Sequence, residues 1–102
     1  MPIATTNPAT GETVRTFPAL DAAALEARIA RAASAFERWR RAPVAERAAV
    51  VRHAGDILDR ERDALGRIMT LEMGKPLKAA VEEAAKCASG CRYYAEHAEA
   101  FL

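Results

Sequence analysis

The chain has 102 residues, a length that fits one domain at most. Its 15 basic and 14 acidic residues give a net charge of +1, which excludes a strong overall field for attracting nucleic acid or an anionic membrane. Of its apolar residues, 25 are alanine and only 19 are Leu, Ile, Val or Phe. Because alanine adds little buried area, the sequence predicts a core too small to stabilise the chain alone.

Two further features bear on the cellular compartment. Two cysteines are too few for a disulfide framework, and the N-terminus has neither a charged start nor an apolar run typical of a signal peptide. No apolar stretch reaches the roughly 20 residues that a membrane span needs. The sequence therefore predicts a soluble, cytoplasmic protein, and its excess of Ala, and of Arg over Lys, indicates a bacterial origin.

Residues 1–18 differ in composition from the rest of the chain. They hold three of the five prolines and five of the six threonines. Two β-prone runs, 3–6 and 12–17, flank a segment in which Pro8 presets φ for a turn and Gly11 can adopt a positive φ. The pattern predicts a β-hairpin over 1–18. Because an isolated hairpin is marginal in water, we expect it to lie on another surface.

Residues 19–102 show helical periodicity and predict about four helices. Asp21 is the expected N-cap of the first, and Pro43 ends it and opens the second. A charged stretch over 59–63 predicts a break, and Gly74 is the expected left-handed cap of the third helix. The apolar face of the first helix comprises Leu25, Ile29, Ala32, Ala33, Phe36 and Trp39.

The fourth predicted helix begins at Lys75-Pro76 and runs to about Phe101. Its small residues would allow close approach of another element. The chain stops at an apolar position with no closing cap, which predicts truncation at the C-terminus. The apolar stripe of this helix comprises Leu77, Val81, Ala84, Ala88, Cys91, Ala95 and Ala98.

Two cysteines are the first candidates for chemistry. Cys87 and Cys91 share a helix face, but His97 points about 240° away from Cys91, and only His53, on another helix, could approach. Two thiols without the paired spacing of a zinc site are weak support for a metal. Core packing is therefore favoured over metal ligation or redox work for both cysteines.

A basic run and two tyrosines are the other candidates. The run Arg38-Trp39-Arg40-Arg41, followed by Arg47 and Arg52, could be a nucleic-acid patch, but flanking glutamates and the low net charge favour a solvated helix end. Tyr93 and Tyr94 are adjacent and cannot both face one core, which places one of them at an interface or channel. No Gly-rich phosphate loop and no catalytic triad spacing occurs.

Five segments stand out in order along the chain: Asn7-Pro8-Ala9-Thr10-Gly11-Glu12, the helix end 32–40, Pro43-Val44-Ala45-Glu46-Arg47, the run Thr70-Leu71-Glu72-Met73-Gly74-Lys75-Pro76-Leu77, and 86–98. In this order and spacing they resemble the aldehyde dehydrogenase family. The last two are most similar to the succinate-semialdehyde dehydrogenase branch, particularly its NADP-preferring bacterial members. The resemblance implies that 1–102 is an N-terminal segment of a cofactor-binding domain. This segment is mainly α, and it is part of an α/β fold when complete.

The resemblance also implies an activity: oxidation of succinate semialdehyde to succinate with NADP or NAD. In the family a cysteine thiolate attacks the aldehyde and a glutamate activates water, and these residues and the cofactor segment come later in the chain. No catalytic, cofactor-binding or metal-binding residue is therefore expected in 1–102. The expected partners are the remainder of the chain, a small aldehyde and further copies in a homo-oligomer, without nucleic acid or membrane.

One site is expected on the fourth helix, which in the family borders the substrate channel. Glu82, Lys86 and Gly90 share a face there, and Lys86 could attract the distal carboxylate of the substrate. The alternative is an ordinary i,i+4 pair between Lys86 and Glu82. For the whole chain, the alternative function is a stand-alone, non-enzymatic helical module that binds a partner through Val81, Ala84, Ala88 and Cys91.

Overall fold

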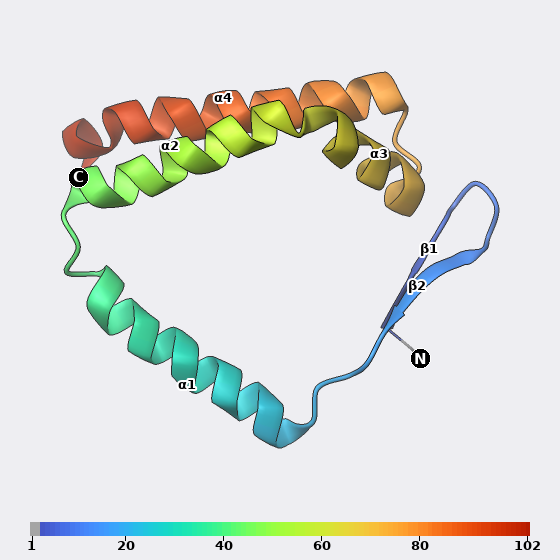
Figure 1. The fold of residues 1–102 in the computed structure, drawn as a ribbon, viewed down its shortest axis with the longest axis horizontal. Coiled ribbons are helices and arrows are strands. Elements are labelled where there is room, and N and C mark those ends of the chain that lie inside the picture. The colour runs from blue at the N-terminus through green and yellow to red at the C-terminus, as the bar shows by residue number, and fades with distance from the viewer. Residues whose placement is uncertain (1–2) are drawn as a thin grey trace.

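The computed structural model describes residues 3–102 and confirms a hairpin followed by four helices (Figure 1). Residues 1 and 2, which the predicted hairpin over 1–18 included, lie outside the described residues. The elements, in chain order, are β1 (Ile3–Thr6), β2 (Thr13–Phe17), α1 (Ala22–Trp39), α2 (Val44–Arg60), α3 (Arg62–Met73) and α4 (Leu77–Phe101).

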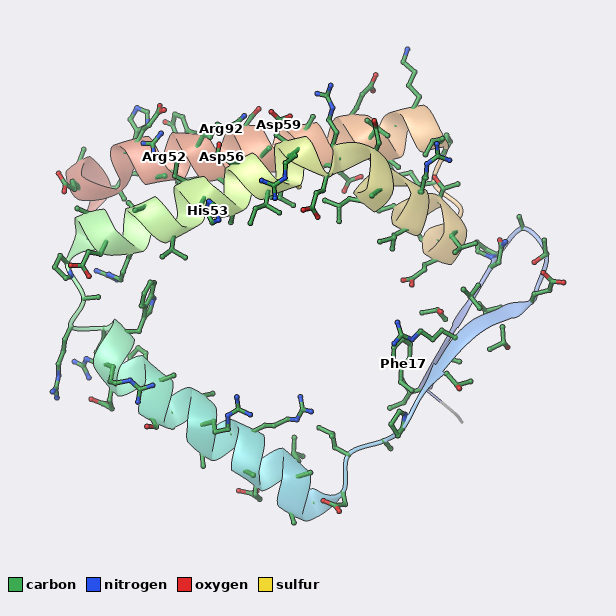
Figure 2. All side chains as sticks on the ribbon, viewed as in Figure 1. Phe17, Arg52, His53, Asp56, Asp59 and Arg92 are labelled. Carbon is green, nitrogen blue, oxygen red and sulfur yellow. The ribbon has the colours of Figure 1, made fainter. Side chains whose placement is uncertain are left out.

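The hairpin is antiparallel and pairs Ile3 with Phe17 at its open end. Its second strand begins at Thr13, one residue later than predicted, because Glu12 belongs to the turn. The main-chain N–H of Asn7 donates to the carbonyl of Glu12 at 2.9 Å, and Gly11 adopts a φ of 77°. All five residues of β2 are exposed, and Phe17 is covered only in part by an arginine of its own strand (Figure 2). Within residues 3–102 the hairpin is supported only where β1 and Pro8 contact the end of α3.

The helix ends follow the local rules that predicted them. The Asp21 carboxylate accepts a hydrogen bond from the N–H of Ala24 at 2.7 Å, as an N-cap does. The chain turns at Glu61 between α2 and α3. Gly74 ends α3 with a φ of 75°, and a Cβ there would lie 2.9 Å from the Pro8 ring of the hairpin turn. Glycine is therefore needed at this position for its conformation and for space.

The packed part of the molecule consists of α4 with α2 and α3. Figure 1 shows α4 running antiparallel to α2, with α3 beside its first half. A Cβ on Gly55 of α2 would lie 3.0 Å from the carbonyl oxygen of Ala88, and one on Gly66 of α3 would lie 2.6 Å from Cγ2 of Val81. Small residues thus let the helix backbones approach closely. The buried apolar residues are all alanines of α4: Ala80, Ala84 and Ala88.

The predicted stripe of α4 is correct at its centre and wrong at its start. Leu77 is 41% exposed, whereas Ala80, which the pattern omitted, is fully buried. The reason is that α3 approaches α4 closely at Gly66, where an added Cβ would meet Val81, the residue directly after Ala80. The part of the stripe assigned to a partner of a stand-alone module is covered by α2 and α3 of this chain. It does not offer a free docking face.

The first helix, α1, buries none of its residues. Ile29 and Phe36 on its apolar face are 54% and 56% exposed. The radius of gyration is 17.7 Å, compared with about 13 Å for a compact domain of 100 residues. These values confirm that the chain has too little core of its own. No helix in residues 3–102 is long and apolar enough to cross a membrane.

Candidate functional site

The outer face of α4 carries the residues that the sequence assigned to a substrate channel. Positions 82 and 86 lie two residues beyond the buried alanines at 80 and 84, which is about 200° around the helix, so they face outward. Glu82 and Lys86 are both exposed and line a shallow hollow of about 620 Å³. Gly90 lies beyond this hollow and is half-buried. The structure therefore brings two of the three predicted residues together.

The charges in this hollow pair in a way that the sequence did not predict. Lys75, just before α4, donates a hydrogen bond to the Glu83 carboxylate. This hydrogen bond, the Lys75 charge and a smaller attraction from Lys86 lower the pKa of Glu83 below its ordinary 4.5. Among residues 3–102 Lys86 forms no ion pair, so the alternative pair with Glu82 is not made. The Lys86 ammonium remains available to a ligand.

The two cysteines occupy different environments. Cys91 is half-buried, and its Cβ would lie 3.0 Å from a Cβ on Gly55, which agrees with packing between α4 and α2. Cys87 is exposed and lines the hollow beside Lys86, so its assignment to core packing is wrong within this chain. The stripe rotates away from position 87 because α4 packs through residues 80, 84 and 88.

The histidines and cysteines do not form a metal-ligating cluster in the described part of the chain. No group of three or more His, Cys, Asp and Glu side chains in residues 3–102 could hold a metal ion. His53 is exposed on α2 (Figure 2). His97 is held on its own helix, with Nδ1 2.7 Å from the carbonyl oxygen of Tyr93 and its ring stacked on Tyr93.

Three arginines of the basic run and its continuation pair with carboxylates. Arg40 and Arg41 both pair with Glu37, at 3.8 and 3.7 Å, and Arg52 pairs with Glu96 at 3.3 Å. These carboxylates offset much of the local positive charge. The observed pairing favours the solvated helix end over a nucleic-acid patch.

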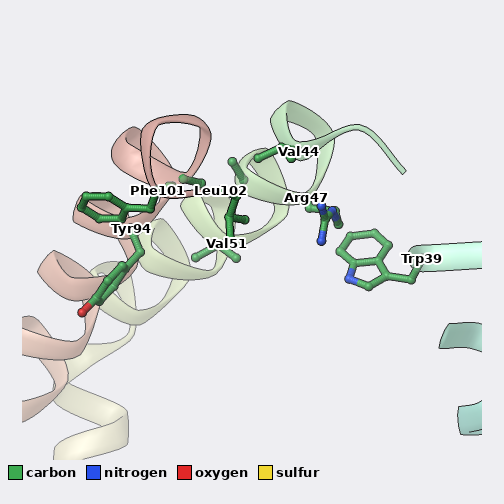
Figure 3. Close-up of a pocket in the computed structure, with 10 residues that line it drawn as sticks. Trp39, Val44, Arg47, Val51, Tyr94, Phe101 and Leu102 are labelled. Carbon is green, nitrogen blue, oxygen red and sulfur yellow. The ribbon is translucent and has the colours of Figure 1, made fainter. Parts of the chain in front are cut away.

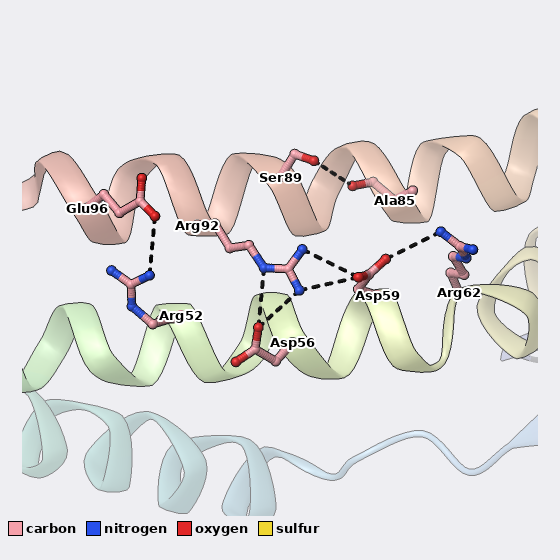
Figure 4. A network of polar contacts seen from close by, with 8 residues as sticks. All are labelled: Arg52, Asp56, Asp59, Arg62, Ala85, Ser89, Arg92 and Glu96. Atoms are coloured by element: carbon pink, nitrogen blue, oxygen red, sulfur yellow. Dashed lines mark hydrogen bonds and ion pairs between the residues drawn. The ribbon is translucent and has the colours of Figure 1, made fainter.

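One polar network was missed by the sequence analysis (Figure 4). Arg92 of α4 donates to Asp56 at 3.0 Å and to Asp59 at 3.3 Å, both on α2. The hydrogen bonds from Asp56 and then Asp59 raise the pKa of Arg92 above its ordinary value. Two aspartates spaced by three residues were the only signal in the sequence, and their partner lies 33 or more residues away. The network fixes α2 against α4 in register.

Comparison with known proteins places this arrangement in a larger context. The chain is 54% identical over all its 102 residues to the succinate-semialdehyde dehydrogenase [NADP(+)] 1 of Mycobacterium tuberculosis, strain H37Rv. The crystal structure of succinic semialdehyde dehydrogenase from Streptococcus pyogenes with NADP+ matches 98% of the chain, with a TM-score of 0.91 and 35% identity. A structure of Gox0499 matches all of it, with a TM-score of 0.95 and 32% identity.

These relatives are much longer than the chain. It spans 22% of the mycobacterial enzyme, 22% of the streptococcal chain and 23% of Gox0499. The elements and the close helix approaches described above are thus those of a part of a larger fold. The profile of the aldehyde dehydrogenase family matches residues 1–102. Sequence profile and structure agree, and the chain belongs to the aldehyde dehydrogenase family.

Proposed function

We propose that this chain is the N-terminal helical part of the cofactor-binding domain of a bacterial, cytoplasmic succinate-semialdehyde dehydrogenase. The complete enzyme would oxidise succinate semialdehyde to succinate with NADP+ and act as a homo-oligomer, without nucleic acid or membrane. The observation that carries the proposal is the 54% identity, over all 102 residues, to an enzyme named for that substrate and cofactor.

The described residues support the assignment of cofactor binding and catalysis to another part of that enzyme. A dinucleotide site needs a strand, a glycine-rich turn and a helix N-terminus. The only sheet in residues 3–102 is an antiparallel hairpin, and the turn that contains Gly11 leads into a strand and not into a helix. NADP+ therefore does not fit the residues present here. Binding of the cofactor, attack on the aldehyde and hydride transfer belong to the remainder of the proposed enzyme.

A chimeric enzyme tests the proposal. Residues 1–102 replace the matching segment of the mycobacterial enzyme, and NADP+ reduction is measured with succinate semialdehyde. We expect turnover within about tenfold of the unmodified mycobacterial enzyme, and no turnover by its remainder alone. A folded, monodisperse chimera without NADP+- or NAD+-dependent turnover would contradict the proposal. A stop codon directly after codon 102 in the gene would instead favour a remnant of such an enzyme or a stand-alone module.

We also propose that Lys86 contributes to substrate binding. It lies on the outer face of α4, has no carboxylate partner among residues 3–102 and lines a hollow with Lys75. Since Glu83 neutralises Lys75, Lys86 is the cation left to attract the distal carboxylate of succinate semialdehyde. Glu82 shares the hollow and limits the attraction, so an exposed pair worth roughly 0.3–1 kcal/mol is the appropriate scale.

Replacing Lys86 by Met in the chimera tests this role. We expect KM for succinate semialdehyde to rise about two- to fivefold, the equivalent of roughly 0.3–1 kcal/mol, while KM for propanal stays constant. Lys78→Met is the matched control, because Lys78 is exposed on the same helix but does not line the hollow. Equal changes in KM for both aldehydes, or no change for either, would leave Lys86 as a surface charge only.

A further inference from the structure

A second hollow, with a mostly apolar lining, lies where the start of α2 meets the end of α4 (Figure 3). Its volume is about 480 Å³. Val44 and Val51 of α2 and Tyr94 and Phe101 of α4 line it, and Trp39 at the end of α1 closes one side. Phe101 and Tyr94 are 58% and 62% exposed. Large apolar side chains thus border a concave surface that nothing in residues 3–102 fills.

The hollow contains one charged residue, Arg47. Its side chain extends from α2 toward the Trp39 indole (Figure 3). The Nε atom is buried and has no hydrogen-bond partner within residues 3–102, and no carboxylate there pairs with the guanidinium. The Nε–H of an arginine is a hydrogen-bond donor and the guanidinium has no acceptor atom. A buried donor without an acceptor is costly, which indicates that the acceptor comes from outside these residues.

The source of that acceptor is inferred from the greater length of the relatives. The chain corresponds to only 22–23% of the matched proteins, while its own fold superposes on them with a TM-score as high as 0.95. The hollow, Trp39 and Arg47 are therefore compatible with the shape that this segment has inside a complete chain. The lining is too apolar for an exposed surface and has only one cation, so its occupant is an apolar segment with one acceptor oxygen.

We propose that the hollow between α2 and α4 seats a segment of the remaining dehydrogenase polypeptide. An apolar side chain of that segment fills the space beside Trp39 and Val51, and an adjacent oxygen accepts a hydrogen bond from Arg47 Nε. Arg47 thereby fixes the helical layer to the rest of the enzyme. This inference rests on the proposed function only in taking the occupant from an aldehyde dehydrogenase chain.

Hydrogen–deuterium exchange of the chimera tests whether a segment outside residues 1–102 fills the hollow. The variant Arg47→Met removes the donor but keeps the aliphatic stem, and Ala48→Leu leaves the donor and fills the hollow from α2. We expect either change to accelerate exchange about tenfold or more in peptides 44–51 and 94–101 and in one peptide outside residues 1–102. Arg41→Met is the matched control, since the Arg41 side chain is 79% exposed and pairs with Glu37. It is expected to leave all these peptides unchanged.

The outcomes separate the two proposals. If both variants change exchange only inside residues 1–102, or change nothing, the proposed packing of another segment in the hollow is refuted, even when the chimera is active. If protection of the hollow falls on dilution together with dissociation of an oligomer, a second copy covers it, and the proposed occupant is wrong. If the variants accelerate exchange in a peptide outside residues 1–102 of a chimera without NADP+-dependent turnover, the proposed packing in the hollow is supported and the proposed activity is refuted.

Discussion

The contact between Gly66 and Val81 gives the sharpest prediction for stability. Gly66 lies in the interior of α3 and is buried against α4. A Cβ added at Gly66 would lie 2.6 Å from Cγ2 of Val81, 3.0 Å from its main-chain nitrogen and 3.2 Å from its Cα. The backbone atoms cannot yield by a side-chain rotation, and the β-branched valine has one preferred rotamer in a helix. The variant Gly66→Ala must therefore push α3 away from α4.

Two effects of opposite sign decide the magnitude. Alanine stabilises a helix interior by about 1 kcal/mol relative to glycine. Overpacking a close contact costs about 1–3 kcal/mol. Gly90→Ala is the matched control, because Gly90 is also helical but a Cβ there would meet no atom within 4 Å. The difference between the two variants cancels the propensity gain and leaves the packing cost, about 1–3 kcal/mol.

Thermal unfolding of the chimera measures this difference. One kcal/mol corresponds to a change in Tm of about 1 °C for a chain of about 460 residues, the length that a 22% share implies. We expect Gly90→Ala to raise Tm or leave it unchanged and the Tm of Gly66→Ala to lie about 1–3 °C below that of Gly90→Ala. The double variant with Val81→Ala should recover part of the loss, since it removes Cγ2 but not the backbone contacts. If Gly66→Ala were as stable as Gly90→Ala, the close approach of α3 and α4 would be refuted.

Three other predictions concern the isolated chain and two local contacts. The purified 102-residue chain should bind a hydrophobic dye, unfold without a sharp transition and show no turnover with NADP+; a cooperative melt of a monomer would contradict this. In the chimera Lys75→Met should lower Tm at pH 7, where the Glu83 carboxylate is charged and paired with Lys75. The lowered pKa of Glu83 means that this pair stabilises the fold above pH 4.5 and that the stabilisation is lost as the carboxylate becomes protonated. At a pH below the pKa of Glu83, Lys75→Met should therefore leave Tm unchanged. Asp21→Ala should cost about 0.5–2 kcal/mol, seen as faster amide exchange at Ala24, whereas an unchanged rate would refute the cap.

The candidate site was predictable only in part. The spacing of 82, 86 and 90 places the three residues on one face of any helix, and the structure brings Glu82 and Lys86 into one hollow. The partner of Glu83 was not predictable, because Lys75 lies before the helix and its position depends on the path of the connection after Gly74. The exposure of Cys87 was mispredicted for a related reason: the direction from which α2 and α3 approach α4 sets which residues are buried.

The sequence by itself determined the local structure. Four local features each depend on groups within a few residues, so the sequence alone predicts them. They are the turn at Gly11, the N-cap at Asp21, the break at Glu61 and the left-handed cap at Gly74. Only the tertiary structure decided which helix faces meet. Arg92 finds its aspartates across 33 and 36 residues, and Arg47 is left without an acceptor, because helix packing brings together segments whose separation along the chain carries no periodic signal.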